Sequence, residues 1–135
     1  MKKSHEPELR FMKDKDSRRL RSMLQTIDKL LKYCEKETLD TFLSNVMLLD
    51  ACAMNILVLG EQANHLSDNC QKRHPQVDWR ANYGLRNRVA HNYFGVYFEI
   101  LWDLIQDDLK PLKLQLTEIL TRENAENTIR SVANT

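Results

Sequence analysis

The fold is decided by the stretch from Ser44 to Arg73, which reads SNVMLLDACAMNILVLGEQANHLSDNCQKR. Apolar and small side chains recur in it every three or four residues, which is the period of one face of an α-helix. The seam consists of Val46, Leu49, Ala53, Ile56, Leu57, Gly60, Ala63 and Asn64. Its small residues favour the close approach of a second helix. Gly60 in mid-helix lowers helix stability by about 1 kcal/mol, which this packing must offset. The stretch therefore predicts one long, closely packed helix.

Two further amphipathic segments flank this helix. Leu, Met and Ile recur at intervals of three and four between Leu20 and Leu31, and Asp16 or Ser17 is placed to cap that first helix. Apolar residues from Val96 to Leu120 follow the same period, and Pro111 removes a hydrogen-bond donor within them. We therefore expect a third long helix with a bend at the proline.

A shorter helical segment lies between the second and third long helices. Pro75 ends the second helix, Asp78 is placed as the N-cap of a new turn, and Trp79 is expected to anchor that turn on the core. A break at Gly84 then precedes a helix over roughly residues 85–93. Three long helices with this shorter one predict an all-α fold, an up-and-down four-helix bundle with a short extra helix.

Composition and length agree with a single helical domain. The chain has 135 residues, of which 42% are hydrophobic, with only 3 Gly and 3 Pro. We expect a flexible extension over residues 1–13, one domain over 14–122 and a flexible tail over 123–135. No run of eighteen apolar residues occurs, and the start of the chain is charged. These features predict a soluble, cytoplasmic protein without a membrane partner.

The cysteines favour a reduced protein. Cys34, Cys52 and Cys70 are odd in number and lie eighteen residues apart, a spacing that fits neither a chelating pair nor a disulfide framework. His5, His65, His74 and His91 show no close pairing. We therefore expect no metal site, and the absence of a phosphate-binding glycine loop or a dinucleotide motif leaves no cofactor to propose.

Chemistry is concentrated in one stretch, Arg86-Asn87-Arg88-Val89-Ala90-His91-Asn92-Tyr93. It places a guanidinium, an amide, an imidazole and a phenol within about two helical turns. Histidine transfers protons near neutral pH, and arginine stabilises the charge that develops on a phosphoryl oxygen. Residues 70–93 contain five basic side chains against one acidic one, a local charge of +4 in a chain of net charge +1. The pattern indicates a site for a phosphodiester.

The motifs of the chain resemble those of a known family over about residues 17–120. They are Leu59-Gly60-Glu61-Gln62-Ala63-Asn64-His65-Leu66-Ser67, His74-Pro75, Asp78-Trp79, Gly84-Leu85-Arg86-Asn87, His91-Asn92-Tyr93-Phe94-Gly95-Val96, Trp102 and Asp107-Asp108-Leu109-Lys110-Pro111-Leu112. In type and order they are similar to the HepT-like branch of the HEPN superfamily. The R-x4-H-x-Y signature is complete at Arg86, His91 and Tyr93.

The resemblance implies a metal-independent endoribonuclease that acts as the toxin of a type VII-like toxin-antitoxin module. Its partner would be a minimal nucleotidyltransferase, which silences the toxin by transferring AMP to the motif tyrosine, here Tyr93. The resemblance also implies a two-fold homodimer in which the two motifs face each other across the interface.

These expectations assign a role to each polar residue of the motif. Arg86 and His91 are the candidate catalytic residues, for charge stabilisation and proton transfer, and Asn87 orients the imidazole or the phosphate. Arg88 is a candidate for binding a flanking phosphate of the RNA, against the alternative of a solvated helix arginine. Tyr93 is a candidate for stacking on a base and for modification.

Two other classes of function stay open on the sequence. The bundle could be a non-catalytic nucleotide-binding or adaptor module that docks a nucleotidyltransferase, with Arg86 and His91 holding a phosphate. A purely structural dimerisation bundle is the third interpretation, and it leaves the polar motif unexplained. Growth arrest on induced expression separates a toxin from an adaptor.

Overall fold

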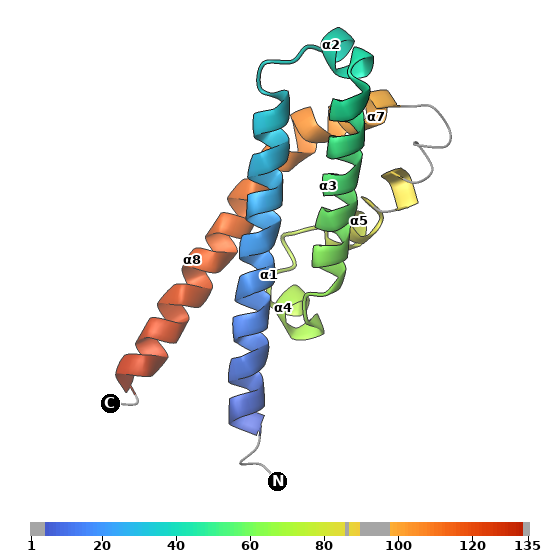
Figure 1. The fold of residues 1–135 in the computed structure, drawn as a ribbon. Helices are drawn as coiled ribbons and strands as arrows, with labels where there is room; N and C mark the ends of the chain where they lie inside the picture. The colour runs from blue at the N-terminus through green and yellow to red at the C-terminus, as the bar shows by residue number, and fades with distance from the viewer. Residues whose placement is uncertain (1–4, 86, 90–97, 134–135) are drawn as a thin grey trace.

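The computed structural model describes residues 5–85, 87–89 and 98–133, and within this part of the chain all regular secondary structure is helical (Figure 1). The helices are α1 (His5–Cys34), α2 (Leu39–Ser44), α3 (Val46–Asn64), α4 (Asp68–Arg73), α5 (Trp79–Tyr83), α7 (Phe98–Asp103), the π-helix η2 (Leu104–Asp108) and α8 (Leu109–Ala133). Residues 85 and 87–89 are also helical. The predicted all-α class is confirmed, whereas the four-helix bundle and the dimer stay predictions.

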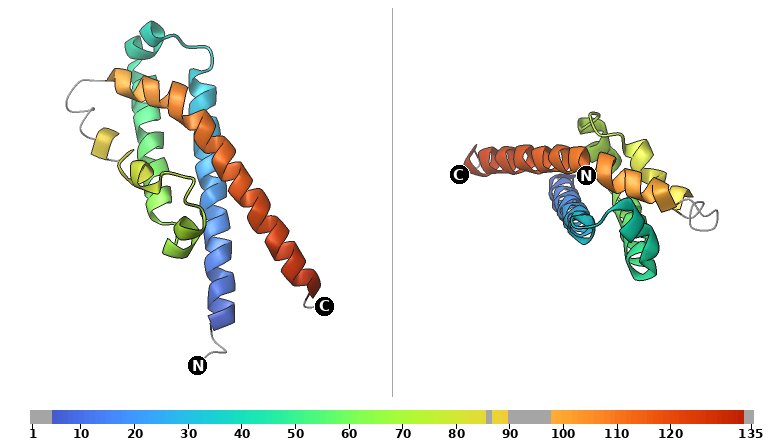
Figure 2. Two further views of the ribbon diagram at one scale, coloured as in Figure 1. Left: turned by 180° about the vertical axis from the view of Figure 1, so that it is seen from behind. Right: turned by 90° about the horizontal axis from the view of Figure 1, so that it is seen from above.

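Helix α1 is the central element of the packing. It contacts α3 along one side and α8 along another, and α8 diverges from it toward the two chain ends (Figures 1 and 2). The core is formed by the apolar stripes of these helices, with Leu20, Met23, Ile27 and Leu30 from α1, Leu49, Cys52, Ile56, Leu59 and Ala63 from α3, and Leu109, Leu116 and Ile119 from α8. Burial of these stripes is what stabilises the helices, because isolated helices of this length are marginal in water.

The start of α1 differs from the prediction. The helix already begins at His5, so neither Asp16 nor Ser17 is its N-cap. Asp16 is instead a buried side chain whose carboxylate accepts hydrogen bonds from the backbone N–H of Ser67, at 2.9 Å, and from the Ser67 hydroxyl, at 2.6 Å. A buried carboxylate requires such partners. The contact joins α1 to the corner between α3 and α4.

The helix predicted over Ser44 to Arg73 is interrupted. Helix α3 ends at Asn64, and α4 begins at Asp68 after Ser67, whose hydroxyl accepts from the backbone N–H of Cys70 at 3.1 Å. Ser67 is therefore an N-cap inside the stretch that was predicted to be continuous. Gly60 is buried in α3, and α3 packs against α1.

Helix α3 is long and apolar enough, by length and composition, to cross a membrane. In this structure Leu49, Ile56 and Leu59 are fully or almost fully buried against the other helices. The opposite side of the helix, with Met47 and Met54, is exposed.

The bend predicted at Pro111 is confirmed, and it lies just before the proline. Helices α7 and α8 are joined by the π-helix η2, and the chain changes direction there (Figures 1 and 2). Pro111 has no N–H to donate to the carbonyl of residue 107, which weakens regular α-helical bonding in this turn. Phe42 of α2 packs on Trp102 of α7, with ring centroids 5.1 Å apart, and covers this end of the core.

The domain boundaries predicted at residues 14 and 122 stay predictions. Helix α8 continues to Ala133, and its packed part includes Glu123, which is buried.

Candidate functional site

Part of the predicted site lies within the described residues. Asn87 and Arg88 are exposed on the short helical segment at residues 85 and 87–89, whereas Leu85 and Val89 are buried in the core. The described residues of this segment therefore have one side in the core and one side exposed. Arg86, His91 and Tyr93 lie outside the described residues, so their predicted roles remain predictions.

The segment that carries the motif is held by a short anchored turn. The Asp78 carboxylate accepts from the backbone N–H of Ala81 at 3.0 Å, which confirms Asp78 as the N-cap of α5. The indole N–H of Trp79 donates to the carbonyl of His74 at 2.9 Å, and the ring is buried, as predicted for an anchor. The amide of Asn82 donates to the carbonyl of Asp78 at 2.9 Å. These bonds fix the chain directly before residues 85–89.

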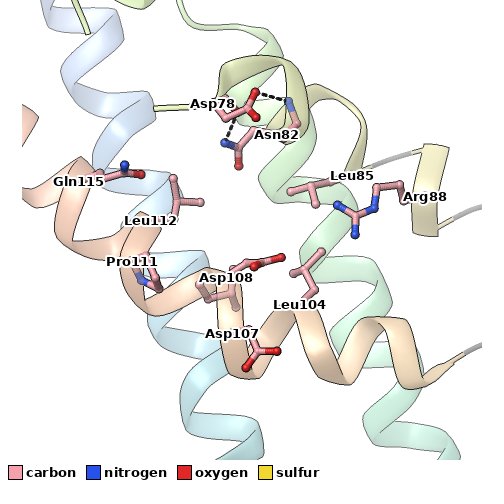
Figure 3. A pocket seen from close by; sticks show the side chains of 12 residues that line it. Asp78, Asn82, Leu85, Arg88, Leu104, Asp107, Asp108, Pro111, Leu112 and Gln115 are labelled. Atoms are coloured by element: carbon pink, nitrogen blue, oxygen red, sulfur yellow. Dashed lines mark hydrogen bonds between the residues drawn. The ribbon is translucent and has the colours of Figure 1, made fainter. Parts of the chain in front are cut away.

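A pocket of about 280 Å³ opens between this turn and the bend of the last helix (Figure 3). One wall comes from α5 and residues 85 and 88, and the other comes from η2 and the first turns of α8. Its lining comprises Asp78, Ala81, Asn82, Leu85, Arg88, Leu104, Asp107, Asp108, Leu109, Pro111, Leu112 and Gln115. A mainly apolar floor with a few convergent polar groups is typical of a small-ligand site.

Arg88 is the predicted site residue that the structure places in this pocket. Figure 3 shows its guanidinium reaching in from one side and the carboxylate of Asp108 on the facing helix. Arg88, Asp107 and Asp108 form no ion pair with one another or with any other residue that the structure describes. Their charges are therefore available to a ligand.

Sequence reasoning missed the other polar groups of the pocket. Asn82, Asp107 and Asp108 are 25 or more residues apart across the two walls, and only the bend at η2 brings them together. In the sequence, Asp107 and Asp108 belong to a motif shared with the family, and no role was predicted for either residue. Two acidic residues between the buried Ile105 and Leu109 are the one signal that could have indicated them.

A second polar cluster is structural in its contacts. The Glu123 carboxylate on α8 lies 2.7 Å from the Arg73 guanidinium and 3.1 Å from His74 Nε2. Glu123 and His74 are both buried, and neither lines the pocket. The pairing compensates the burial of the charge and ties the far part of α8 to the end of α4.

The three cysteines are free and buried, in agreement with the predicted reduced state. Burial, with the Asp16 carboxylate nearby, raises the pKa of the Cys70 thiol to about 12. The Sγ atoms of Cys34 and Cys52 are 3.7 Å apart. Their hydrogen bond lowers the pKa of Cys34 and, together with burial, raises that of Cys52. Cys52 and Cys70 are therefore protonated at neutral pH.

Fold and site together define an all-helical protein with polar groups gathered beside the short segment at residues 85–89. The family model described as "Ribonuclease HepT-like" matches residues 23–119. The chain belongs to this HepT-like family of the HEPN superfamily.

Two curated relatives illustrate the similarity. The protein named "Putative RNase TTE0752" of Caldanaerobacter subterraneus subsp. tengcongensis is 28% identical over 104 residues, which cover 77% of this chain and 93% of the relative. The "Probable ribonuclease HepT" of Thermococcus cleftensis is 24% identical over 94 residues, which cover 70% and 86%. No solved structure matches the chain.

Proposed function

We propose that this protein is a metal-independent endoribonuclease, the cytoplasmic toxin of a type VII-like HEPN toxin-antitoxin module. The observation that carries the proposal is the match to the HepT-like ribonuclease model over residues 23–119, a range that includes Arg86, His91 and Tyr93. Relatives matched over most of their length carry ribonuclease names. RNA is accordingly the proposed substrate.

The proposed reaction is a transesterification within the RNA. The 2′-oxygen attacks the adjacent phosphorus, the bond from phosphorus to the 5′-oxygen breaks, and a 2′,3′-cyclic phosphate and a 5′-hydroxyl result. An imidazole of His91 removes the 2′-hydroxyl proton, and an imidazolium protonates the leaving oxygen. Arg86 stabilises the charge of the phosphorane, and Asn87 orients the imidazole or the phosphate. Arg88, exposed and without an ion pair among the described residues, contacts the RNA next to this centre.

A two-fold dimer would supply both histidines, because each chain has one His91. The exposed apolar face of α3 supports this assembly. Met47, Ala51, Met54 and Val58 lie on one stripe of the helix, and Met47 and Met54 are 83% and 60% exposed. Apolar side chains exposed in such a row are typical of a protein interface. We propose that this face and the motif face form one continuous isologous interface.

The proposed antitoxin is a minimal nucleotidyltransferase that transfers AMP to the hydroxyl of Tyr93. The transferred group adds a negative charge and bulk beside the basic residues of the motif, and both oppose RNA binding. The Tyr93→Phe variant is expected to cleave RNA as the native protein does and to escape silencing. If the partner still silences this variant, a residue other than Tyr93 receives the AMP group.

The proposal is tested by incubating the purified protein with single-stranded RNA in excess EDTA and identifying the product ends by mass spectrometry. We expect cleavage with 2′,3′-cyclic phosphate ends, and its loss in both Arg86→Ala and His91→Ala. The exposed Arg21→Ala variant, which removes one positive charge on α1, serves as the control. Cleavage that survives in both motif variants would refute the proposed site, and RNA binding without any cleavage would favour the adaptor function.

A further inference from the structure

We propose that the pocket beside Arg88 is a base-binding subsite that accepts a guanine of the RNA next to the cleaved linkage. The proposal rests on the ribonuclease function proposed above and adds a substrate preference to it. It is argued from the lining of the pocket, from charges at its rim that form no ion pair among the described residues, and from one buried amide.

The shape and lining of the pocket fit a flat, largely apolar group. Its volume of about 280 Å³ is small, and its floor is formed by leucines and a proline, namely Leu85, Leu104, Leu109, Pro111 and Leu112. Pockets with apolar walls and a few placed polar groups bind small ring systems well. A nucleobase is such a group.

The buried amide of Asn82 has one unused hydrogen-bonding atom. Asn82 is only 8% exposed, and its nitrogen donates to the Asp78 carbonyl. Its oxygen accepts no hydrogen bond from any residue that the structure describes, and Figure 3 shows it turned toward the pocket. Because this oxygen faces the pocket and has two lone pairs, it is suited to accept a hydrogen bond from a ligand N–H.

The charged side chains of the pocket determine which base it binds. The Asp108 carboxylate and the Asn82 oxygen are acceptors, and Arg88 supplies donors from the opposite side (Figure 3). Asp107 lines the same wall and adds a second negative charge to it. Guanine presents N–H donors on its Watson–Crick edge and the O6 and N7 acceptors on the other edge, which an arginine binds in bidentate fashion. Adenine, cytosine and uracil present fewer donors to the acidic wall.

The same charges place the phosphates outside the pocket. Asp107 and Asp108 outnumber Arg88, so a phosphodiester inside would be repelled. Arg80, next to the lining residue Ala81 on α5, is exposed and basic, and a backbone phosphate is attracted there. The pocket therefore holds an uncharged base while the sugar-phosphate chain runs past it.

The test measures binding of an RNA that cannot be cut. The probes are 2′-O-methyl oligouridines that each contain one guanine, one hypoxanthine or one adenine, and hypoxanthine differs from guanine in lacking the 2-amino group. Binding is measured by fluorescence anisotropy. We expect the native protein to bind the guanine probe about tenfold more tightly than the hypoxanthine probe, since one specific base contact is worth about this factor. In the double variant Asp107→Asn/Asp108→Asn, this ratio should fall to about one.

A matched control removes equal charge outside the pocket. The double variant Glu99→Gln/Asp103→Asn changes two exposed acidic residues on α7 that do not line the pocket. Both double variants should bind the adenine probe more tightly, because they carry less negative charge, but only the control should keep the preference for guanine. All four side chains are exposed, so neither pair is needed for folding.

Two results would overturn the subsite: a native protein without base preference, or a preference that survives in the Asp107→Asn/Asp108→Asn variant. If the native protein shows no base preference and the Asp107→Asn/Asp108→Asn variant loses binding to a protein partner, the pocket instead binds a cationic side chain of that partner.

The ribonuclease function and the base subsite can be refuted independently. A protein that prefers guanine yet leaves RNA intact refutes the nuclease alone, and one that cuts RNA regardless of sequence refutes the subsite alone.

Discussion

The contact between Asp16 and Ser67 is expected to be one of the larger single contributions to stability. The substitution Asp16→Ala removes a carboxylate that is 5% exposed and accepts two hydrogen bonds from Ser67. Hydrogen bonds to charged groups contribute about 1.5 to 3 kcal/mol each. Because both bonds join the same two residues, their energies do not add fully, and we expect a loss of about 2 to 4 kcal/mol.

Asp28 on the same helix provides the matched control. Its carboxylate lies 2.7 Å from Lys113 Nζ, but the side chain is 55% exposed. An exposed pair contributes about 0 to 1 kcal/mol, so Asp28→Ala should lower the free energy of unfolding by no more than that. Both substitutions replace Asp by Ala within α1, so the change in helix propensity is similar and cancels in the comparison.

The assay is equilibrium unfolding in urea at one fixed protein concentration, because an oligomer would make the midpoint depend on concentration. A Ser67→Ala variant and the double variant complete a thermodynamic cycle, in which the coupling energy isolates the contact from other effects of each substitution. If Asp16→Ala costs no more than Asp28→Ala, or if the coupling energy is near zero, the structural role given to Asp16 is wrong.

Three further predictions concern other parts of the fold. Burial raises the pKa of Cys70 from 9.0 to about 12, so above pH 9 the unfolded state releases this proton and the folded state does not. This thiol should lower stability by up to about 1.4 kcal/mol per pH unit between pH 9 and 12, in addition to the effect of Cys52, whose pKa is also raised. The slope in pH-dependent urea titrations should therefore be smaller in Cys70→Ala, and equal slopes would exclude the effect. The Asn45 side chain accepts a hydrogen bond from the backbone N–H of Leu48 at the start of α3, so Asn45→Ala should lower the free energy of unfolding in urea by about 1 kcal/mol. The exposed Asn69→Ala variant is the control, and an equal loss in it would contradict the capping role. For the proposed dimer, light scattering should show that Met54→Glu is a monomer. The control Leu114→Glu, which changes an exposed leucine of α8, should remain a dimer. A dimeric Met54→Glu variant would show that the interface does not include this face of α3.

The sequence was sufficient for the helices that depend on apolar periodicity. The stripes of α1, α3 and α8 recur every three or four residues, and the local signals at Asp78, Trp79 and Pro111 act within one turn. The break at Ser67 was missed because apolar periodicity continues across it. The capping signal of Ser67 is local, but its decisive partner is Asp16, 51 residues earlier, and no local pattern predicts such a contact.

The contiguous residues of the motif could be proposed from the sequence, whereas the pocket residues that the fold brings together could not. Asn87 and Arg88 were identified from the polar segment, and both are exposed in the structure. The acidic residues of the pocket depend on the bend at η2, which places Asp107 and Asp108 in its lining, with Asp108 opposite Arg88 (Figure 3). The sequence predicted that bend from Pro111, but it could not indicate what the bend would face.

The proposed chemistry is tested most directly by changing one atom of the substrate. An RNA is first mapped for its cleaved linkage, and the same RNA is then made with 2′-deoxyribose only at the nucleotide that precedes this linkage. If the 2′-oxygen is the nucleophile, the purified protein in EDTA will leave that linkage intact while it cuts the unmodified RNA. Cleavage of both RNAs at the same rate would show that water attacks the phosphorus, and it would contradict the account.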